Sequence, residues 1–464
     1  MSENTTFGKV KPAQPGGFND FQPASARIRE DLLHDVTTVF KRFGFVPLET
    51  PVIEFREVLI GEAGETEKEI FDISSKEEDK KLSMRFDLTV GLSRYVAANP
   101  ELVLPFKRYQ IGQVFRGEKP QAGRYRQFAQ LDLDIVGTRS MMAEAEVLTA
   151  MRQALQVFNP GEFYYRINHR ALLEGLAQKV NIAPNANFTP VEQAKQLMRV
   201  LDKLEKIGMD EVKKELGRAP VDAHDNALQL TPGAIELVEK FLTATGSNEE
   251  ILAQAEALVG DTEDGKQGLK DLRDLIAYLE HWGLDNEKAR IDLSVARGLD
   301  YYTGPVFETT IVGGEQWGSV MSGGRYDDLV ARFSGQQVPA VGGSIGFDRL
   351  YRLLSEEQDI IKPSEQPMVD AVIMLFDDCY IPAVVDMARR LQDGGISAEV
   401  AYTSDRSFKG QMNYALKRNA KYLLIYGDRE EANNEVAVKN LNTRKQTTIS
   451  LEGSLPQNIV DALG

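Results

Sequence analysis

Residues 297–308, which read Arg-Gly-Leu-Asp-Tyr-Tyr-Thr-Gly-Pro-Val-Phe-Glu, place a cation, two carboxylates and two tyrosines around two glycines. A second polar, glycine-rich stretch, Ser-Gly-Gly-Arg-Tyr-Asp, follows at 322–327. An arginine can neutralise an anion, and tyrosine hydroxyls can bind a polar ligand. Glycines let the backbone approach that ligand closely. Both stretches are therefore candidates for a binding site, although a strand–turn–strand with a surface arginine gives the same pattern.

Another candidate site lies in two expected strands, 106–116 and 127–137, which are joined by the polar loop 117–126. Because side chains alternate along a strand, one face of the second strand carries Gln130, Asp132 and Asp134. Four cations lie in or beside the loop: Arg116, Lys119, Arg124 and Arg126. Such a set suits a phosphorylated ligand next to a cationic or amino-bearing one. A solvated hairpin whose charges pair with each other is the alternative.

Two shorter segments carry weaker signals. Asp87 and Thr89 are two residues apart, so they share a face if the segment is extended. The alternative is an N-cap for the helix expected after them. The glycine-rich segment 341–350 reads as a strand that enters a helix carrying Arg349. Many helices carry such an arginine on their surface, so this segment decides little alone.

Basic residues gather between positions 402 and 421, with aromatic residues interleaved. The cations are Arg406, Lys409, Lys417, Arg418 and Lys421. Cations and aromatic rings together suit the phosphates and bases of single-stranded RNA. A solvated helix face is the alternative interpretation.

The elements that must position these residues can be traced along the chain. Apolar residues recur at helical spacing over 26–42, and an extended segment follows at 45–51. An Ala-, Leu-, Glu- and Lys-rich stretch predicts a helical insertion, and alternating strand and helix patterns near the C-terminus predict a small α/β domain with an open sheet. The expected division is a catalytic domain at 1–172 and 285–357, the insertion at 173–284, a linker at 358–367 and the C-terminal domain at 368–464.

Composition narrows the class of protein. A chain of 464 residues can hold two or three domains. It begins without the features of a signal peptide and has no apolar run as long as a membrane span, so we expect a cytosolic protein. The single Cys379 and four scattered histidines argue against a disulfide and a zinc site. The formal charge of −16 argues against general nucleic-acid binding but allows a specific basic surface.

Taken together, the motifs resemble the histidyl-tRNA synthetase family, which belongs to the class II aminoacyl-tRNA synthetases. The resemblance extends from Lys11 to about Val460. Motif 1 is similar to residues 26–51, motif 2 to residues 115–134 and motif 3 to residues 341–350. The two histidine-specific motifs are similar to residues 297–308 and 322–327, and the anticodon-binding segment to residues 402–421. Motif 1, a dimer element, has the least sequence detail.

The resemblance implies an α+β fold: a class II antiparallel sheet with flanking helices, a helical insertion and a C-terminal α/β anticodon-binding domain. It implies a cytoplasmic homodimer that acts on ATP with Mg²⁺, L-histidine and tRNA(His), with no zinc and no membrane attachment. The histidine carboxylate attacks the α-phosphate of ATP to form histidyl-adenylate. The terminal ribose hydroxyl of tRNA(His) then takes the histidine, so the expected activity is that of a histidine–tRNA ligase.

The same resemblance assigns the ATP contacts and the catalytic residues. Catalysis would rest on Arg116 and Arg297, with Arg297 beside the α-phosphate in place of a second metal ion. The ATP contacts would be Arg116 at the α-phosphate, Glu118 at the adenine amino group, Phe128 on the adenine ring, and Arg124 and Arg349 at the γ-phosphate.

Histidine and tRNA contacts follow in the same way. Asp87 and Thr89 would hold the α-amino group, and Tyr302 with Asp134 would read the imidazole. The other expected histidine contacts are Gln130, Arg297, Tyr301 and Tyr326. The expected tRNA contacts are Lys119 and Gln121 at the acceptor end, and Arg406, Lys409, Lys417 and Lys421 at the anticodon.

Two alternatives stay open at this point. The histidyl-synthetase-like regulatory subunit of ATP phosphoribosyltransferase keeps the catalytic fold but binds ligands without charging tRNA. It lacks the anticodon domain and often loses motif arginines, whereas this chain has both. A pseudo-synthetase that senses RNA would need a linked effector domain, and the sequence shows none.

Overall fold

A computed structural model describes residues 10–60, 70–74, 80–119, 123–180, 190–221, 225, 227–296, 301–362 and 367–463. The chain divides into two compact units. The first is built from Met1–Asp20 and Asp31–Ile361, and the second from Phe21–Glu30 and Lys362–Gly464. Among the described residues, none of the helices has the length and apolar character needed to cross a membrane.

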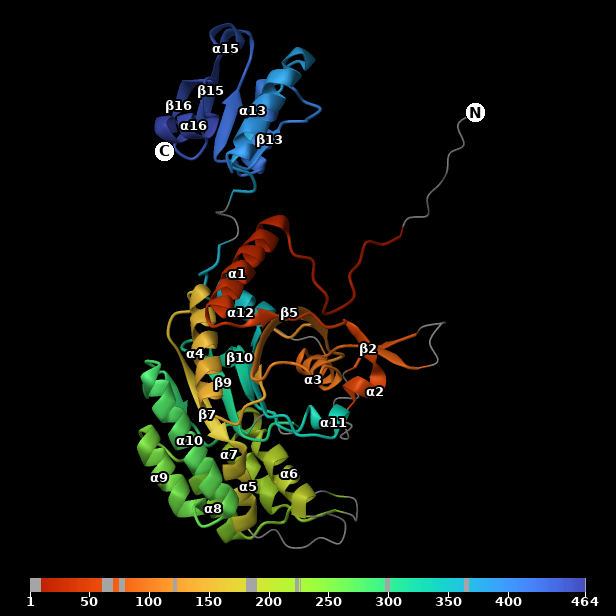
Figure 1. Cartoon of the computed structure of the whole chain (residues 1–464), viewed down its shortest axis with the longest axis vertical. Helices are drawn as coiled ribbons and strands as arrows, with labels where there is room; N and C mark the ends of the chain where they lie inside the picture. The colour runs from red at the N-terminus through yellow and green to blue at the C-terminus, as the bar shows by residue number, and fades with distance from the viewer. Residues whose placement is uncertain are drawn as a thin grey trace. The chain divides into compact units, whose positions relative to one another are not determined.

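An eight-stranded sheet forms the centre of the first unit, in the order β1-β5-β6-β11-β10-β9-β7-β8 (Figure 1). Neighbours from β5 to β7 pair antiparallel, while the edge strands β1 and β8 pair parallel with theirs. The predicted antiparallel sheet is therefore confirmed. The strands are β1 (Val46–Pro47), β5 (Phe106–Phe115), β6 (Gln127–Val136), β7 (Phe163–His169), β8 (Ala289–Ile291), β9 (Pro305–Ile311), β10 (Met321–Arg325) and β11 (Ala340–Gly346).

One face of this sheet is apolar and lies against helices. Leu131, Leu133 and Ile135 of β6 join one buried core with side chains of α1 (Pro23–Arg42) and α4 (Met142–Val157). The helix predicted at 26–42 thus begins earlier, at Pro23. The alternation of β6 leaves Gln130, Asp132 and Asp134 on the opposite face, as predicted.

Glycines in β10 and β11 keep that opposite face open. A Cβ on Gly342 would lie 1.9 Å from the Asp134 Oδ1 atom, and one on Gly324 would lie 2.7 Å from the Pro305 carbonyl oxygen and 2.9 Å from the Tyr302 ring. Side chains at these positions would displace the carboxylate or separate the strands. The glycines therefore preserve a polar hollow over the middle of the sheet.

Shorter elements border the sheet. A three-stranded sheet has the order β2-β4-β3 and pairs antiparallel. Its strands and the nearby helices are β2 (Ile53–Phe55), β3 (Asp72–Ile73), β4 (Leu82–Met84), α2 (Arg56–Leu59), α3 (Thr89–Ala98), α11 (Ala331–Ser334), α12 (Phe347–Arg352), the 3₁₀ turn η2 (Glu315–Trp317) and the π-helical turn η3 (Leu353–Glu357).

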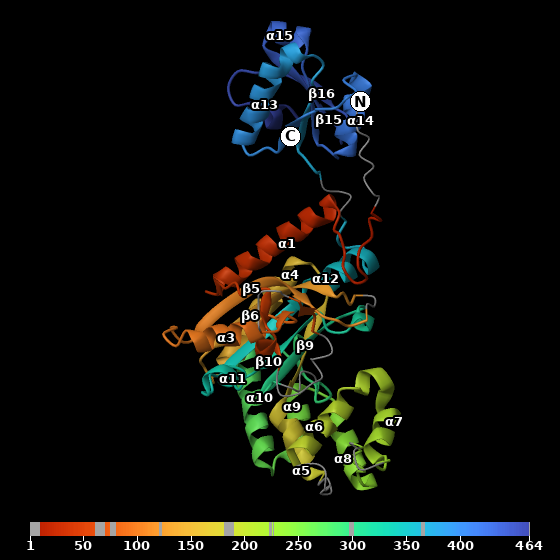
Figure 2. The same ribbon diagram turned by 90° about the vertical axis from the view of Figure 1, so that its right-hand side faces the viewer.

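Helices fill the stretch between β7 and β8. They are α5 (Arg170–Lys179), α6 (Pro190–Leu201), α7 (Leu204–Gly217), α8 (Pro232–Leu242), α9 (Asn248–Val259) and α10 (Glu263–His281). The longest of them, α10, packs against α5 and against α4 (Figure 2). Leucines at helical spacing along α10, such as Leu272, Leu275 and Leu279, are buried and belong to the same core as the sheet.

The second unit contains a five-stranded sheet in the order β13-β12-β14-β15-β16. Its first three strands pair parallel and its last three antiparallel. Side chains of α13 and α16 pack on one face and those of α14 on the other. The elements are β12 (Ala371–Ile373), the 3₁₀ turn η5 (Asp378–Tyr380), α13 (Ile381–Asp393), β13 (Ala398–Val400), α14 (Phe408–Lys417), β14 (Tyr422–Ile425), α15 (Asp428–Asn433), β15 (Glu435–Asn440), β16 (Gln446–Ser450) and α16 (Leu455–Leu463). The predicted open α/β sheet is confirmed, whereas α15, β16 and α16 were not predicted.

Candidate active site

Two cavities adjoin on the polar face of the large sheet. The first, hereafter the arginine cavity, has a volume of about 270 Å³ and is lined by Arg116, Glu118, Gly123, Arg124, Tyr125, Phe128, Gln130, Ser319, Val320, Ser322, Ser344, Gly346 and Arg349. The second, hereafter the aspartate cavity, has a volume of about 220 Å³ and is lined by Phe86, Asp87, Thr89, Arg116, Gln130, Asp132, Asp134, Tyr301, Tyr302, Ser322, Tyr326, Gly342, Gly343 and Ser344. Four residues line both and form a common wall: Arg116, Gln130, Ser322 and Ser344.

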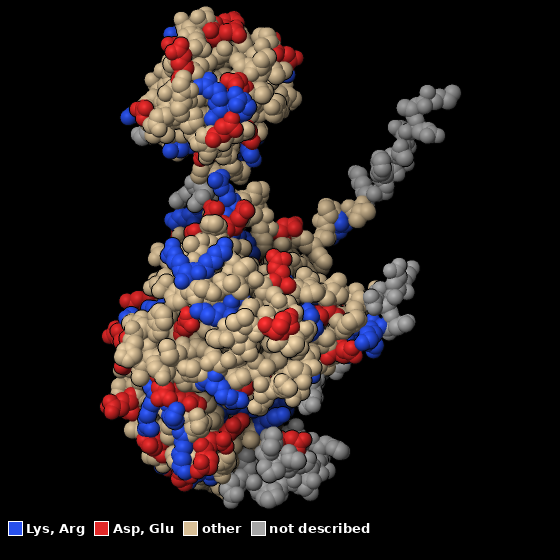
Figure 3. All heavy atoms as spheres, viewed as in Figure 1, with Lys and Arg blue, Asp and Glu red and all other residues tan. Residues whose placement is uncertain are grey.

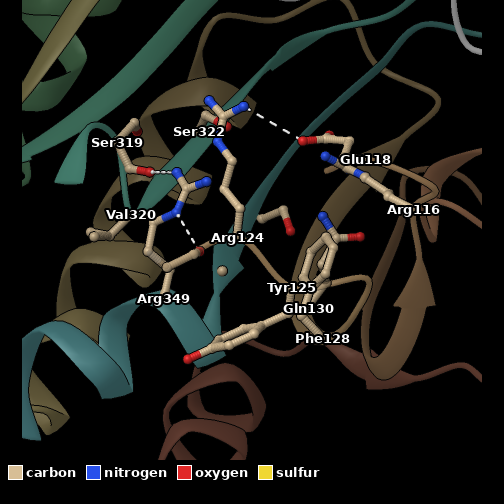
Figure 4. Close-up of a pocket in the computed structure, with 13 residues that line it drawn as sticks. Arg116, Glu118, Arg124, Tyr125, Phe128, Gln130, Ser319, Val320, Ser322 and Arg349 are labelled. Carbon is tan, nitrogen blue, oxygen red and sulfur yellow. Dashed lines mark hydrogen bonds and ion pairs between the residues drawn. The ribbon is translucent and has the colours of Figure 1, made fainter. Parts of the chain in front are cut away.

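Three guanidinium groups dominate the arginine cavity (Figure 4). Arg116 donates from Nε to the Phe86 carbonyl oxygen at 3.1 Å, and its guanidinium carbon lies 5.2 Å from the centre of the Phe128 ring. Arg124 forms an ion pair with Glu118 at 3.5 Å. These groups converge on a hollow that could take a polyanion bound to a flat ring.

Backbone carbonyls fix the third cation, Arg349. Its Nη1 donates to the Ser319 carbonyl oxygen at 2.8 Å, and its Nε donates to the Gly123 carbonyl oxygen at 3.4 Å (Figure 4). The neighbouring Asp348 accepts a hydrogen bond from the Ala129 N–H at 2.5 Å, which ties α12 to β6. Arg349 therefore bridges the loop before β6 and the hairpin before β10.

The tryptophan of η2 packs behind Gly123, which lines the arginine cavity. Gly123 has a left-handed φ of +71°, and a Cβ there would lie 2.6 Å from Trp317 Cζ3. The Arg352 guanidinium carbon stands 5.9 Å from the centre of the Trp317 ring and 6.0 Å from that of Tyr125. The indole thus holds the loop that carries Arg124 against the wall of the cavity.

Carboxylates and tyrosines dominate the aspartate cavity. Asp134 accepts a hydrogen bond from the Tyr326 hydroxyl, and its Oδ2 lies 2.9 Å from Arg108 Nη2. Asp87 precedes α3 and accepts a hydrogen bond from the Val90 N–H at 3.1 Å. Asp87 therefore makes the hydrogen bond that the N-cap alternative predicts. The extended segment expected at this position is wrong, because Thr89 is the first residue of α3. Both residues nevertheless line the cavity.

Burial controls the ionisation of the carboxyl and hydroxyl groups that line this cavity. It raises the pKa of Asp87 to about 6 and that of Asp132 to about 7, because a carboxylate away from water loses its hydration. Burial also raises the pKa of Asp134, and the Arg108 guanidinium opposes that rise. The pKa of Tyr302 is raised well above its usual range by burial, so its hydroxyl keeps its proton. The cavity therefore offers neutral hydroxyls and carboxyl groups that a bound cation would ionise.

The structure gathers the predicted residues into two groups. Every described residue expected to contact ATP lines the arginine cavity, and every described residue expected to contact histidine lines the aspartate cavity. Arg297 and Gln121 lie outside the described residues. Lys119, which lies between β5 and β6, is exposed. The sequence assigned no role to Arg108, Asp132, Ser322 or Ser344, although the period of β6 placed Asp132 on the correct face.

In the second unit the four predicted cations, Arg406, Lys409, Lys417 and Lys421, are exposed. They lie on or next to α14, where Tyr402 and Phe408 are also exposed, by 77% and 47%. Arg406 makes an ion pair with Asp378 at 2.7 Å. On the face that Figure 3 shows, acidic and basic side chains are interspersed over both units. Exposed cations are therefore present locally, although the total charge of the protein is negative.

The chain is similar to known proteins over nearly its whole length. A family model for histidyl-tRNA synthetase matches residues 17–350, and one for an anticodon-binding domain matches residues 370–457. A histidine–tRNA ligase of Clostridium tetani is 35% identical over 450 residues, which cover 96% of this chain and 98% of that protein. A crystal structure of a histidyl-tRNA synthetase from Nostoc sp. PCC 7120 matches with a TM-score of 0.83 and 31% identity, covering 98% of this chain and all of that one.

A further solved structure shares the fold. It is described as an ATP phosphoribosyltransferase regulatory subunit/histidyl-tRNA synthetase from Bacillus halodurans C. It matches with a TM-score of 0.73 and 21% identity, and covers 91% of this chain. At that identity the likeness concerns the fold alone.

Proposed function

The chain belongs to the histidyl-tRNA synthetase family, and we propose that its two adjoining cavities divide the small substrates between them, with ATP in the arginine cavity and histidine in the aspartate cavity. Its activity is the ligation of histidine to tRNA: histidine is activated with ATP to histidyl-adenylate and then transferred to the 3′ end of tRNA(His). The observation that carries the proposal is the common wall of Arg116, Gln130, Ser322 and Ser344. Two ligands that meet at such a wall bring their reacting groups together.

In the arginine cavity, Arg116 would bind the α-phosphate, and Arg124 and Arg349 the γ-phosphate. Support comes from the three guanidinium groups, since arginine is suited to bidentate contacts with phosphate. Phe128 would stack on the adenine ring and Glu118 would accept from its amino group. Glu118 is the one carboxylate among the described residues that line this cavity. Mg²⁺ would therefore be held mainly by the ATP phosphates, would enter with them and would neutralise part of their charge.

In the aspartate cavity, Asp87, Thr89 and Gln130 would hold the α-amino group of histidine. Asp134 and Tyr302 would read the imidazole at the end of the cavity, and Tyr301 would complete its wall. Tyr326 would act by holding Asp134 in place, which its hydroxyl already does. A site built from buried hydrogen-bonding groups rejects apolar side chains, because its own groups would be left without partners.

The reaction follows from this placement. A histidine carboxylate oxygen attacks the α-phosphorus of ATP and pyrophosphate leaves, which gives histidyl-adenylate. The 3′-terminal ribose hydroxyl of tRNA(His) then attacks the adenylate carbonyl carbon and AMP leaves. Arg116 and Arg297 would neutralise charge at the α-phosphate during the first step. The protein supplies position and fixed charge, and no protein nucleophile is required.

The same proposal includes the macromolecular contacts. Lys119 and Gln121 would touch the acceptor end of tRNA, and Arg406, Lys409, Lys417 and Lys421 would contact the anticodon region. The exposed cations and rings around α14 support this, because bases stack on aromatic rings and phosphates attract cations.

We also propose a homodimer that assembles through the motif 1 region. Several large apolar side chains on or near β1, β2 and the segment before β5 are exposed, and burial against a second copy would remove them from water. They are Val46, Val52, Ile53, Phe55, Val103 and Leu104.

The division of the chain is part of the proposal. Residues 1–172 and 285–357 would form the catalytic domain, 173–284 an insertion, and 368–464 the anticodon-binding domain. The helices α6 to α10 between β7 and β8 support the insertion. The family matches end at residue 350 and resume at 370, which supports a linker at 358–367.

The regulatory-subunit alternative is not better supported. A non-charging subunit would have no use for an anticodon-binding domain, whereas the chain matches one over residues 370–457. A charging assay tests the choice: we expect the purified protein to attach histidine, and not threonine, proline or glycine, to tRNA(His). A protein that binds histidine but charges no tRNA would favour the regulatory reading.

A further inference from the structure

Besides the Ser344 hydroxyl, three buried oxygen atoms of the aspartate cavity make no hydrogen bond and no ion pair within the described parts of the chain. They are Asp87 Oδ2, Gln130 Oε1 and Asp132 Oδ1. A buried polar atom without a partner costs free energy, so native proteins rarely keep several in one place unless a ligand satisfies them. All three are acceptors, and the ligand that completes them must therefore bring donors.

The neighbouring Asp134 is engaged differently. One of its oxygens accepts from the Tyr326 hydroxyl and the other faces the Arg108 guanidinium at 2.9 Å. Asp132 lies on the same face of β6 as Asp134 but is two residues closer along the strand to Gln130, which belongs to the common wall. Its side chain is buried, with 3% of its surface exposed, and Oδ1 makes no hydrogen bond with a described group, although the Ser344 hydroxyl opposite it in β11 is close enough to lower the pKa of Asp132. Asp132 thus retains an unused acceptor between the wall and the closed end of the cavity.

We propose that Asp132 is a further residue that binds the histidine substrate, and that its Oδ1 joins Asp87 Oδ2 and Gln130 Oε1 in accepting the N–H bonds of the substrate's α-ammonium group. The inference rests on the histidine site proposed above and adds Asp132 to it. An ammonium group has three donors and no acceptor, which matches three acceptors without donors. An imidazole ring brings only one or two N–H groups. Two carboxylates around one cation also give the stronger, charge-assisted bonds.

The ionisation of the cavity agrees with this role. Burial raises the pKa of Asp132 to about 7, so its carboxyl is partly protonated at neutral pH before a ligand binds. A bound ammonium group favours the carboxylate and lowers that pKa. Histidine binding should therefore release protons near pH 7, and affinity should rise as pH rises through that range. The charged and titratable groups facing Asp132 are Arg85, Asp87, Arg108, Asp134, Tyr301, Tyr302 and Tyr326.

Asp132→Asn tests the proposal, because it keeps the shape of the side chain and removes the charge. Calorimetric titrations would compare histidine and histidinol, which carry the amine, with 3-(imidazol-4-yl)propionate, which lacks it. We expect the Kd for the two amines to rise about 10- to 100-fold, the effect of losing a charge-assisted hydrogen bond. The Kd for the amine-free analogue should change less than about 2-fold. Asp328→Asn, which removes an exposed carboxylate from the same unit, should change neither.

The pH dependence of the Kd for histidine provides a second test with the same proteins. Because asparagine imitates the protonated carboxyl, the ratio of the variant's Kd to the wild-type Kd should be small at pH 5.5 and grow towards pH 8. Unchanged histidine affinity in a folded Asp132→Asn protein would overturn the inference, as would an equal loss for the amine-free analogue.

A measurement on the wild type covers a variant that fails to fold. Titration of histidine in two buffers of different ionisation enthalpy counts the protons released. We expect more release near pH 7 with histidine and histidinol than with the amine-free analogue, and equal release overturns the role of Asp132. A wild-type protein that binds no histidine would instead overturn the proposed histidine site itself.

Discussion

Arg116 is one of the four residues at which the two cavities meet. Its Nε is held by the Phe86 carbonyl oxygen at 3.1 Å, so the guanidinium group is oriented before any ligand arrives. A cation fixed in this way stabilises charge that develops on an α-phosphate without having to reorganise during the reaction. Gln130 stands on the same wall and faces both cavities. These two side chains therefore link the ATP site to the histidine site in the proposed mechanism.

Arg297 carries the sharpest prediction at the scale of a residue. We expect Arg297→Ala to lower the rate of histidyl-adenylate formation by about 10²- to 10³-fold, the usual effect of removing one preorganised donor at a site of developing charge. Pyrophosphate exchange measures this step, and circular dichroism checks the fold. Near-normal exchange by a folded Arg297→Ala protein would show that this arginine does not serve the α-phosphate.

At the scale of elements, the contact between Gly123 and Trp317 shapes the arginine cavity. Gly123→Ala must place a Cβ 2.6 Å from the indole at a φ of +71°, so the loop carrying Arg124 has to move. We expect the KM for ATP to rise about 10-fold or more, because the displaced loop weakens the charge-assisted contact of Arg124 with phosphate, while histidine binding is kept.

Gly313→Ala provides the matched control for that change. Gly313 has a similar φ of +79°, but a Cβ there would meet no atom within 4 Å. Both substitutions should lower stability to a similar extent, and only Gly123→Ala should affect ATP. Equal KM values for ATP in the two variants would refute a role for the Gly123–Trp317 contact.

A buried ion pair joins α4 to the end of β10. Glu144 accepts from Arg325 Nε at 2.6 Å and from Nη2 at 2.8 Å, and both side chains are buried. Glu144→Gln would leave the buried guanidinium with Asp327, which lies 3.2 Å from Nη1, as its counter-charge. We therefore expect a loss of about 3 kcal/mol in the free energy of unfolding, the lower end of the range for a broken buried pair.

Glu146→Gln is the control for the Glu144 prediction. Glu146 lies on the same helix and pairs with Lys107 at 2.6 Å, but about a quarter of each side chain is exposed. Its loss should cost less than about 1 kcal/mol. Urea unfolding of both variants gives the comparison, and equal losses would mean that burial of the pair does not decide its contribution.

The elements also show what the sequence could and could not predict. The alternation of β6 placed Gln130, Asp132 and Asp134 on one face because period two is a local property. The partnership of Arg108 with Asp134 was not predictable, because it depends on the register of β5 against β6, in which these residues are opposite. The short α15 and β16 were missed for another reason. They bury little apolar surface, so they leave no periodic pattern in the sequence.

Across the whole molecule, the residues proposed to bind the substrates divide between the two units. Every described residue assigned to ATP or histidine belongs to the first unit, and the cations around α14 belong to the second. We predict that removing Met368–Gly464 leaves histidine-dependent pyrophosphate exchange measurable but severely impairs the charging of tRNA(His). The reason is that anticodon contacts contribute to tRNA affinity and not to adenylate formation.

Salt provides a control for the truncation. Binding of the full-length protein to tRNA should weaken as salt rises, because phosphate contacts release counterions. The truncated protein should show a smaller slope, since it lacks Arg406, Lys409, Lys417 and Lys421. Equal loss of exchange and charging would mean that the second unit is needed for the catalytic fold, and unimpaired charging would remove its proposed role with RNA.

Pyrophosphate exchange by the full-length protein is the most direct measurement of whether ATP and histidine react across the wall shared by the two cavities. We predict exchange of labelled pyrophosphate into ATP that requires histidine and falls by about 10²-fold or more in a folded Arg116→Ala protein. Exchange that proceeds without histidine, or that Arg116→Ala leaves at the wild-type rate, would contradict this prediction.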